Sequence, residues 1–91
     1  MKFEWDENKR ISNLAKHRLD FQDAHLVFND ESFFVEDERY QYDEARFILY
    51  GTLLGRVIVV VFSMPDDDVV RIISMRKGTK RERKSYYQKL Y

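Results

Sequence analysis

A run of six apolar residues from Val57 to Phe62 restricts the fold of this chain more than any other feature. Five of the six side chains are β-branched, and such side chains favour extended backbone. Successive side chains of a strand point to opposite faces, so a run without a polar residue predicts a strand that is buried on both faces. We therefore expect residues 56–63 to form a central strand of a sheet.

The segments around this strand predict a small α+β domain, with two helices before an antiparallel meander of about four strands and one helix after it. A chain of 91 residues can bury one hydrophobic core, and no linker or repeat divides it. We therefore expect a single domain over residues 1–91. The expected elements are a short edge strand or anchoring arm at 3–5, helices at 6–17 and 21–28, strands at 32–36, 46–50, 56–63 and 69–75, and a helix at 80–90.

Polar residues mark the expected helix starts. Asp6 and Asp20 are N-cap candidates for the first two helices, and Thr79 with Glu82 has the spacing of a capping box. The first helix carries apolar residues at helical spacing, which predicts an amphipathic helix. These apolar residues are Ile11, Leu14, Ala15 and Leu19.

The formal net charge is zero, with 16 basic and 16 acidic side chains, but the two signs are segregated. Residues 20–45 hold one basic and nine acidic side chains, a net charge of −8. Residues 69–91 hold eight basic side chains and one acidic side chain, a net charge of +7. The basic end can meet a polyanion and the acidic middle can hold a basic partner. Mutual neutralisation within the fold is the alternative.

The chain contains no cysteine, which excludes disulfides, thiolate metal ligands and cysteine nucleophiles and suits the reducing cytoplasm. No apolar run approaches the ~18 residues of a membrane span, and the first six residues carry charge where a signal peptide is apolar. The two histidines, His17 and His25, lie outside any metal-binding motif. We therefore expect a cytoplasmic protein with no metal, no cofactor and no contact with a membrane.

Arg71 lies within the segment Val-Val-Arg-Ile-Ile, and an arginine among apolar strand residues needs an ionic partner or a ligand. If the meander pairs around its two turns, position 71 lies opposite about 62, which lies opposite about 45. Glu44 and Arg46 would then lie within two strands of Arg71. Both a structural ion pair with Glu44 or a neighbouring aspartate and a ligand-binding site are open.

Seven basic residues between positions 71 and 84, followed by Tyr86 and Tyr87, form a basic cluster. Guanidinium groups suit bidentate contacts with phosphate, and tyrosine rings stack on bases. An ordinary solvated helix surface is the alternative. His17, beside Lys16, is either a general acid or base or a helix-end residue that bonds to backbone carbonyls.

Three groups of residues, spread from Phe3 to Tyr87, form a combined pattern. They are Phe3-Glu4-Trp5-Asp6, Lys9, Asn13, Lys16-His17 and Phe21; then Glu44-x-Arg46 with Phe47 and Gly51; then Arg71-Ile72-Ile73-Ser74-x-Arg76-Lys77-x-Thr79-Lys80-Arg81-Glu82-Arg83 with Tyr87. This pattern resembles the signature of the BrnT toxins. Arg18 departs from it, because glycine usually follows the Lys-His pair, and we expect the connection between the first two helices to differ.

The resemblance implies a RelE-like fold and the activity of a ribonuclease toxin of a type II toxin–antitoxin pair. Such a toxin inhibits translation by cutting RNA and is neutralised by a BrnA-like antitoxin that carries a DNA-binding domain. The resemblance further implies a complex of two toxins with two antitoxins. This complex represses its own operon, and it reaches operator DNA only through the antitoxin.

RNA cleavage without a metal uses the ribose 2′-OH as the nucleophile. The protein must remove its proton, stabilise charge on the phosphate oxygens and protonate the leaving 5′-oxygen. We expect Arg71, Arg76 and Arg46 to stabilise the charge and Glu44 or His17 to act as the base. The residues expected to bind RNA are Lys16, Lys77, Lys80, Arg81 and Arg83.

Two alternatives to a ribonuclease stay open. A non-catalytic nucleic-acid-binding or regulatory module would need only the basic cluster. A protein-interaction module would use the acidic middle to hold a basic partner, through a sheet edge or exposed aromatic residues. The candidates are Phe33, Phe34, Tyr40 and Tyr42, although core packing also suits Phe33 and Phe34.

Overall fold

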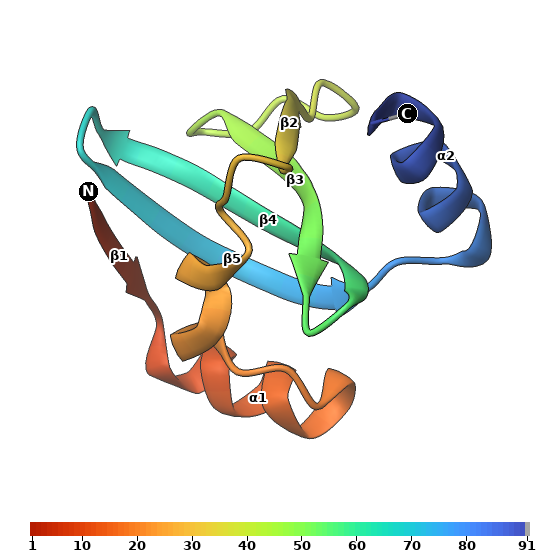
Figure 1. Cartoon of the computed structure of the whole chain (residues 1–91). Coiled ribbons are helices and arrows are strands. Elements are labelled where there is room, and N and C mark those ends of the chain that lie inside the picture. Colours follow the sequence, from red (N-terminus) through yellow and green to blue (C-terminus); the bar gives the residue numbers. More distant parts are fainter. Residues whose placement is uncertain (91) are drawn as a thin grey trace.

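Strand β4 is the central strand of a five-stranded sheet whose order is β1-β5-β4-β3-β2, as the apolar run predicted. The computed structural model describes residues 1–90. Figure 1 shows α1 and η1 beside one another and α2 beyond the end of β5. The elements are β1 (Lys2–Trp5), α1 (Glu7–His17), the 3₁₀ helix η1 (Phe21–Leu26), β2 (Phe33–Glu36), β3 (Arg46–Leu53), β4 (Arg56–Asp66), β5 (Val69–Lys77) and α2 (Lys80–Leu90).

The sheet is mixed, which corrects the prediction of an antiparallel meander of about four strands. Strands β2 to β5 do form an antiparallel meander, but β1 adds a fifth strand that runs parallel to β5. The register pairs Lys2 with Val69 and Trp5 with Ile72. A parallel pair needs a long crossover connection, and here residues 6–68 supply it. Turn residues in the sequence indicate only hairpins between consecutive strands, so they could not predict the pairing of β1 with β5.

One face of the sheet packs against η1 and forms the hydrophobic core. Phe21 and Ala24 of η1 and the following Val27 are at most 1% exposed. They lie over core residues of β3, β4 and β5. At Gly51 of β3, an added Cβ would sit 2.7 Å from the carbonyl oxygen of Val27, so a larger residue cannot pass under this segment. The second N-terminal helix, predicted over residues 21–28, is a short 3₁₀ helix in the structure. Its N-cap is Asp20, as the sequence predicted.

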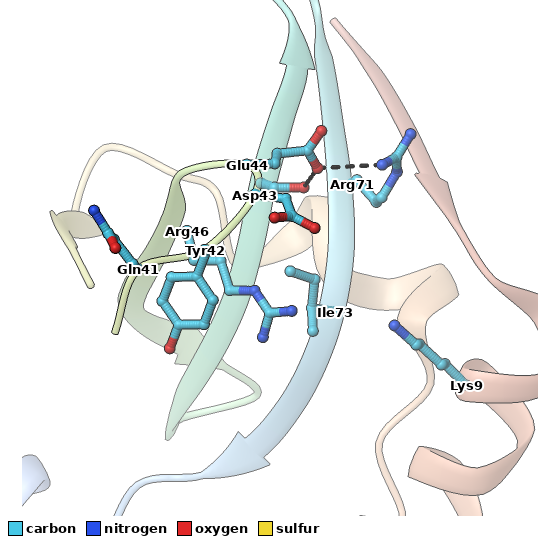
Figure 2. A pocket seen from close by; sticks show the side chains of 9 residues that line it. Lys9, Gln41, Tyr42, Asp43, Glu44, Arg46, Arg71 and Ile73 are labelled. Atoms are coloured by element: carbon cyan, nitrogen blue, oxygen red, sulfur yellow. Dashed lines mark hydrogen bonds and ion pairs between the residues drawn. The ribbon is translucent and has the colours of Figure 1, made fainter. Parts of the chain in front are cut away.

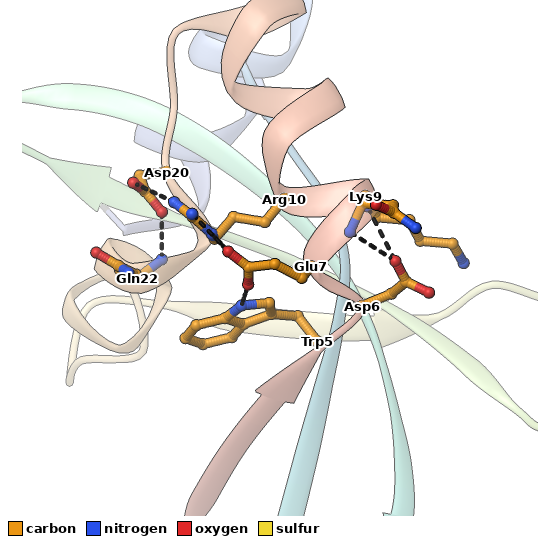
Figure 3. A network of polar contacts seen from close by, with 8 residues as sticks. Trp5, Asp6, Glu7, Lys9, Arg10, Asp20 and Gln22 are labelled. Atoms are coloured by element: carbon orange, nitrogen blue, oxygen red, sulfur yellow. Dashed lines mark hydrogen bonds and ion pairs between the residues drawn. The ribbon is translucent and has the colours of Figure 1, made fainter.

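A polar network joins β1, α1 and η1 (Figure 3). Trp5 Nε1 donates to Glu7, and Arg10 bonds both to Glu7 and, at 3.1 Å, to Asp20. Asp6 accepts from two backbone N–H groups of the first helical turn, which confirms it as the N-cap of α1. These contacts fix the angle at which α1 leaves the sheet.

Helix α1 has the predicted bounds but not the orientation of a simple amphipathic helix. Ile11 is 55% exposed and Leu14 is 37% exposed, whereas the buried residue of the helix is Asn13. The side-chain amide of Asn13 donates to the carbonyl of Met75 at 3.0 Å and accepts from its N–H at 3.2 Å. Strand β1 pairs with β5 only as far as Ile72, so Asn13 satisfies edge groups of β5 that lie beyond that pairing.

Arg18 ends α1 in the left-handed conformation, with φ of 61° and ψ of 27°. Its N–H bonds to the carbonyl of Leu14. Arginine thus adopts the left-handed helix end that glycine would favour, and the expected difference in the connection between the two helices stays a prediction. The contacts of Asn13 and Asp20 on either side hold the backbone there at a local cost of about 1 kcal/mol.

Candidate active site

A row of polar residues crosses four strands on the face of the sheet opposite the core. Arg46 of β3 pairs with Ser63 of β4, Ser63 pairs with Arg71 of β5, and Arg71 pairs with Glu4 of β1. Paired residues point to the same face, so the four side chains form one line. The sequence predicted this neighbourhood, with a register that differs from the observed one by one residue between β4 and β5 and by two residues between β3 and β4.

Arg71 lies between two carboxylates at the centre of this row, and Figure 2 shows its contact with one of them, Glu44. Its Nε donates to Glu4 at 2.7 Å, and its Nη1 donates to Glu44 at 3.1 Å. The hydrogen bond with Glu4, more than any other effect, raises the pKa of Arg71 above its usual value. The side chain is 44% exposed, so the guanidinium is held in position and still reaches solvent.

Glu44 precedes β3 and is held by a second contact. The hydroxyl of Ser63, which is 1% exposed, donates to the same Glu44 oxygen at 2.6 Å. One carboxylate oxygen of Glu44 thus receives both Ser63 and Arg71, and the other has no bond among the described side chains. A carboxylate that is fixed through one oxygen and open at the other can accept a proton from a bound molecule.

A hollow of about 380 Å³ opens beside these residues. Lys9 of α1 points toward it from one side, and Tyr42 lies on the other, where its ring is 4.4 Å from the Arg46 guanidinium (Figure 2). The sequence did not single out Lys9, Tyr42 or Ser63 as site residues, although Lys9 is part of the family pattern. The lining residues are Lys9, Gln41, Tyr42, Asp43, Glu44, Arg46, Ser63, Arg71 and Ile73.

A β-bulge brings Arg76 to the same face as Arg71. The two residues are five positions apart, so an unbroken strand would place them on opposite faces. Phe62 pairs with Ile72 and Val61 pairs with Ser74, which leaves Ile73 as the extra residue. Arg71 and Arg76 therefore lie opposite β4 residues four apart, a separation of roughly 13 Å along the sheet.

Arg76 belongs to a second hollow, of about 450 Å³, at the end of α1. The predicted site residues thus divide between two places: Glu44, Arg46 and Arg71 share the first hollow, whereas Lys16, His17, Arg76 and Lys77 share the second. The second is lined by Lys16, His17, Arg18, Arg76, Lys77 and Thr79. Five of its six residues can carry positive charge, which suits a phosphate.

Arg76 is also bound to α2 by two hydrogen bonds. Its Nη1 and Nη2 donate to the two oxygens of Glu82 at 2.6 and 2.9 Å. Glu82 accepts from the Thr79 N–H, and the Thr79 hydroxyl accepts from the Glu82 N–H, which confirms the predicted capping box. The bonds from Arg76, the largest of several causes, lower the pKa of Glu82 to about 2.

We expect Glu82→Gln to lower the free energy of unfolding by about 1–3 kcal/mol at pH 7. Because the folded-state pKa of Glu82 lies below its usual value of 4.5, its contribution is complete above pH 4.5 and is lost as the pH falls toward 2. Urea titrations of the parent and variant should therefore converge over that range. The matched control is Asp67→Asn, an exposed acid that bonds to no described side chain. A difference that stays constant down to pH 2 would contradict the ionic role of Glu82.

The remaining predicted RNA-binding residues lie outside both hollows. Lys80, Arg81 and Arg83 are exposed residues of α2, and Arg83 donates to the carbonyl of Gly78 at 2.9 Å. Within residues 1–90, no three histidine, aspartate or glutamate side chains come together in a group that could hold a metal ion. None of the helices in the same range is long and apolar enough to span a membrane.

Known proteins match the chain in both sequence and fold. The family model for the ribonuclease toxin BrnT of type II toxin–antitoxin systems matches residues 5–82. The fold is similar to the 1.1 Å crystal structure of the Brucella abortus ribonuclease toxin BrnT, with 33% sequence identity and a TM-score of 0.72 over 88% of this chain and 99% of that chain. No curated protein sequence matches the chain. The chain therefore belongs to the BrnT family of ribonuclease toxins of type II toxin–antitoxin systems.

Proposed function

We propose that this toxin cuts RNA without a metal ion and that the reaction takes place beside Arg71. The observation that carries the proposal is the bonding of Arg71 and Ser63 to one oxygen of Glu44, next to Arg46 and an open hollow. This arrangement places a base and two guanidinium groups within reach of one phosphodiester. Attack by a ribose 2′-OH needs a base that removes its proton and positive groups that stabilise the charge on the phosphate.

In the proposed reaction, Glu44 removes the proton of the 2′-OH through its open oxygen. The 2′-oxygen attacks phosphorus, the bond to the 5′-oxygen breaks, and that oxygen takes a proton from water as it leaves. The products are a 2′,3′-cyclic phosphate and a 5′-hydroxyl. Arg71 and Arg46 stabilise the extra negative charge on the phosphate oxygens, and each such donor contributes about 3–4 kcal/mol to the transition state.

The second hollow binds a neighbouring part of the RNA in this proposal. Its positive side chains surround Arg76, roughly 13 Å along the sheet from Arg71. Lys16 and Lys77 hold phosphate there, and His17 is available to exchange a proton. Lys80, Arg81 and Arg83 of α2 extend the positive surface outward from this hollow. Tyr42, beside Arg46, offers a ring on which a base can stack.

Membership of the family also indicates which kind of partner the toxin has. A type II toxin–antitoxin system implies an antitoxin that neutralises the toxin. We infer that this antitoxin is BrnA-like, that two toxins bind two antitoxins, and that the complex represses its own operon by contacting operator DNA through the antitoxin. Free toxin then inhibits translation by cutting RNA. The similarity of the fold to that of RelE also stays a prediction.

We expect purified toxin to cut RNA equally well with and without EDTA, because no proposed step uses a metal ion. The measurement is the appearance of shorter RNA that ends in a 2′,3′-cyclic phosphate. Activity that disappears with EDTA and returns with a divalent ion would refute the metal-free reaction. A shift in RNA mobility without shorter products would favour a non-catalytic nucleic-acid-binding module.

A further inference from the structure

Strand β2 is an open edge of the sheet. Within the described residues 1–90, its only neighbour is β3, with Phe34 paired to Leu49 and Glu36 paired to Phe47. The N–H of Asp37 bonds to the carbonyl of Arg46, so the backbone groups of Val35, two residues earlier, also point to β3. By the same alternation, the N–H and C=O groups of Phe34 and Glu36 point away from the sheet. An unpaired row of this kind is a template for another strand.

Apolar side chains border this edge. Phe34 is 57% exposed and Val35 is 43% exposed, whereas Phe33 stacks on Tyr50 and Tyr86. Both predicted core candidates contact other rings, because Phe34 meets Phe47 and Phe62 edge-on, but Phe34 keeps more than half of its surface exposed. A groove of about 340 Å³ runs between β2 and α2. It is lined by Phe33, Val35, Tyr50, Arg81, Glu82, Ser85, Tyr86 and Lys89.

The charges around β2 restrict what can bind there. Exposed acids precede the strand at Asp30 and Glu31, end it at Glu36 and follow it at Glu38. These four acids disfavour RNA along the edge of β2, whereas the basic side chains of the adjoining groove, Arg81 and Lys89, belong to α2. This edge also opposes a second copy, since antiparallel pairing centred on Phe34, which joins outward-pointing residues, would bring Glu38 of one copy opposite Asp30 of the other. The occupant that satisfies both the open edge and these acids is an extended protein segment with apolar residues flanked by basic ones.

We propose that β2 is the surface on which the antitoxin docks, by adding a strand with a basic flank to this edge of the sheet. The inference rests on the proposed toxin–antitoxin function, which implies a protein inhibitor. Backbone hydrogen bonds to Phe34 and Glu36 set the register, apolar side chains enter the groove beside α2, and basic side chains meet the acids at either end. The acids that flank β2 thereby serve the inhibitor, whereas Glu44 and the basic residues opposite the core serve RNA.

The test measures the affinity of toxin variants for the purified antitoxin encoded with this toxin. Phe34→Pro removes an outward N–H and leaves the ladder with β3 intact, since proline is tolerated on edge strands. Phe34→Ala is its control, because it loses the same side chain and keeps the N–H. We expect Phe34→Pro to weaken binding about tenfold more than Phe34→Ala. A variant with both Glu36→Lys and Glu38→Lys should also bind about tenfold more weakly.

The control for the charge variant is Asp23→Lys with Asp67→Lys, which reverses two exposed acids away from β2 and should bind like the parent. Equal affinity of the parent and the Glu36→Lys/Glu38→Lys variant, or of the Phe34→Pro and Phe34→Ala variants, would overturn the proposal. So would loss of binding in Leu54→Asn, a change at the exposed tip of the β3–β4 hairpin. RNA cleavage by the free variants should match the parent. A parent that binds its antitoxin through β2 but cuts no RNA would refute the proposed ribonuclease reaction and leave the docking surface standing.

Discussion

Arg71→Ala is expected to slow RNA cleavage about 100- to 1,000-fold while the chain stays folded. Arg71 is the one guanidinium that bonds to Glu44 among the described residues, so its loss removes a charge stabiliser and releases the proposed base. The effect on stability should be below about 1 kcal/mol, because the ion pairs with Glu4 and Glu44 are half-exposed. Single-turnover cleavage of RNA and urea unfolding of the same preparations measure both effects.

Two further variants sharpen this experiment. Arg71→Lys keeps a positive charge but cannot bond to Glu4 and Glu44 in two directions, so we expect an intermediate rate. Arg56→Ala removes an exposed arginine at the other end of the sheet and should leave the rate unchanged. If Arg71→Lys is folded and cuts RNA at the parental rate, the geometry of the guanidinium has no part in catalysis. If Arg71→Ala unfolds, Arg71 is structural, and the loss of RNA cleavage in that variant is no evidence for a catalytic role.

The strands could be predicted because their signals are local. The apolar run from Val57 to Phe62 indicated the central strand, and Asp6 and Thr79 indicated helix starts that the structure confirms. The parallel pairing of β1 depends on contacts between residues about 67 positions apart, which no local pattern records. The spacing of the apolar residues in α1 also could not predict which side of the helix faces the sheet. This orientation is set by a side-chain amide that bonds to the edge of β5.

The site was predictable where an unusual residue stood in a regular strand. Arg71 among apolar neighbours needed a partner, and the meander brought Glu44 to it. The bulge at Ile73 was not predictable, since no glycine marks it, and it alone places Arg76 on the face of Arg71. Lys9 reaches the site because α1 lies along β5, so its place depended on the orientation of that helix.

Asn13→Ala should lower the free energy of unfolding by about 2–4 kcal/mol. Asn13 is 8% exposed, and its amide bonds to both backbone groups of Met75 and to the carbonyl of Leu19. Alanine leaves these groups without partners in a place that water reaches poorly, and each orphaned group costs about 1–3 kcal/mol before relaxation. Urea unfolding at pH 7 measures the loss. Ser12→Ala, at an exposed position of the same helix, should change stability by no more than about 0.5 kcal/mol.

The same variant separates the structural part of the family pattern from its chemical part. Asn13 belongs to that pattern, yet its side chain faces the backbone of β5 and lines neither hollow. At a temperature where Asn13→Ala is folded, we therefore expect cleavage within about threefold of the parent, against the 100-fold loss or more for Arg71→Ala. A folded Asn13→Ala that cuts RNA as poorly as Arg71→Ala would show that α1 sets the geometry of the site. Lys9, Lys16 and His17, which α1 carries to the two hollows, would then be the residues displaced.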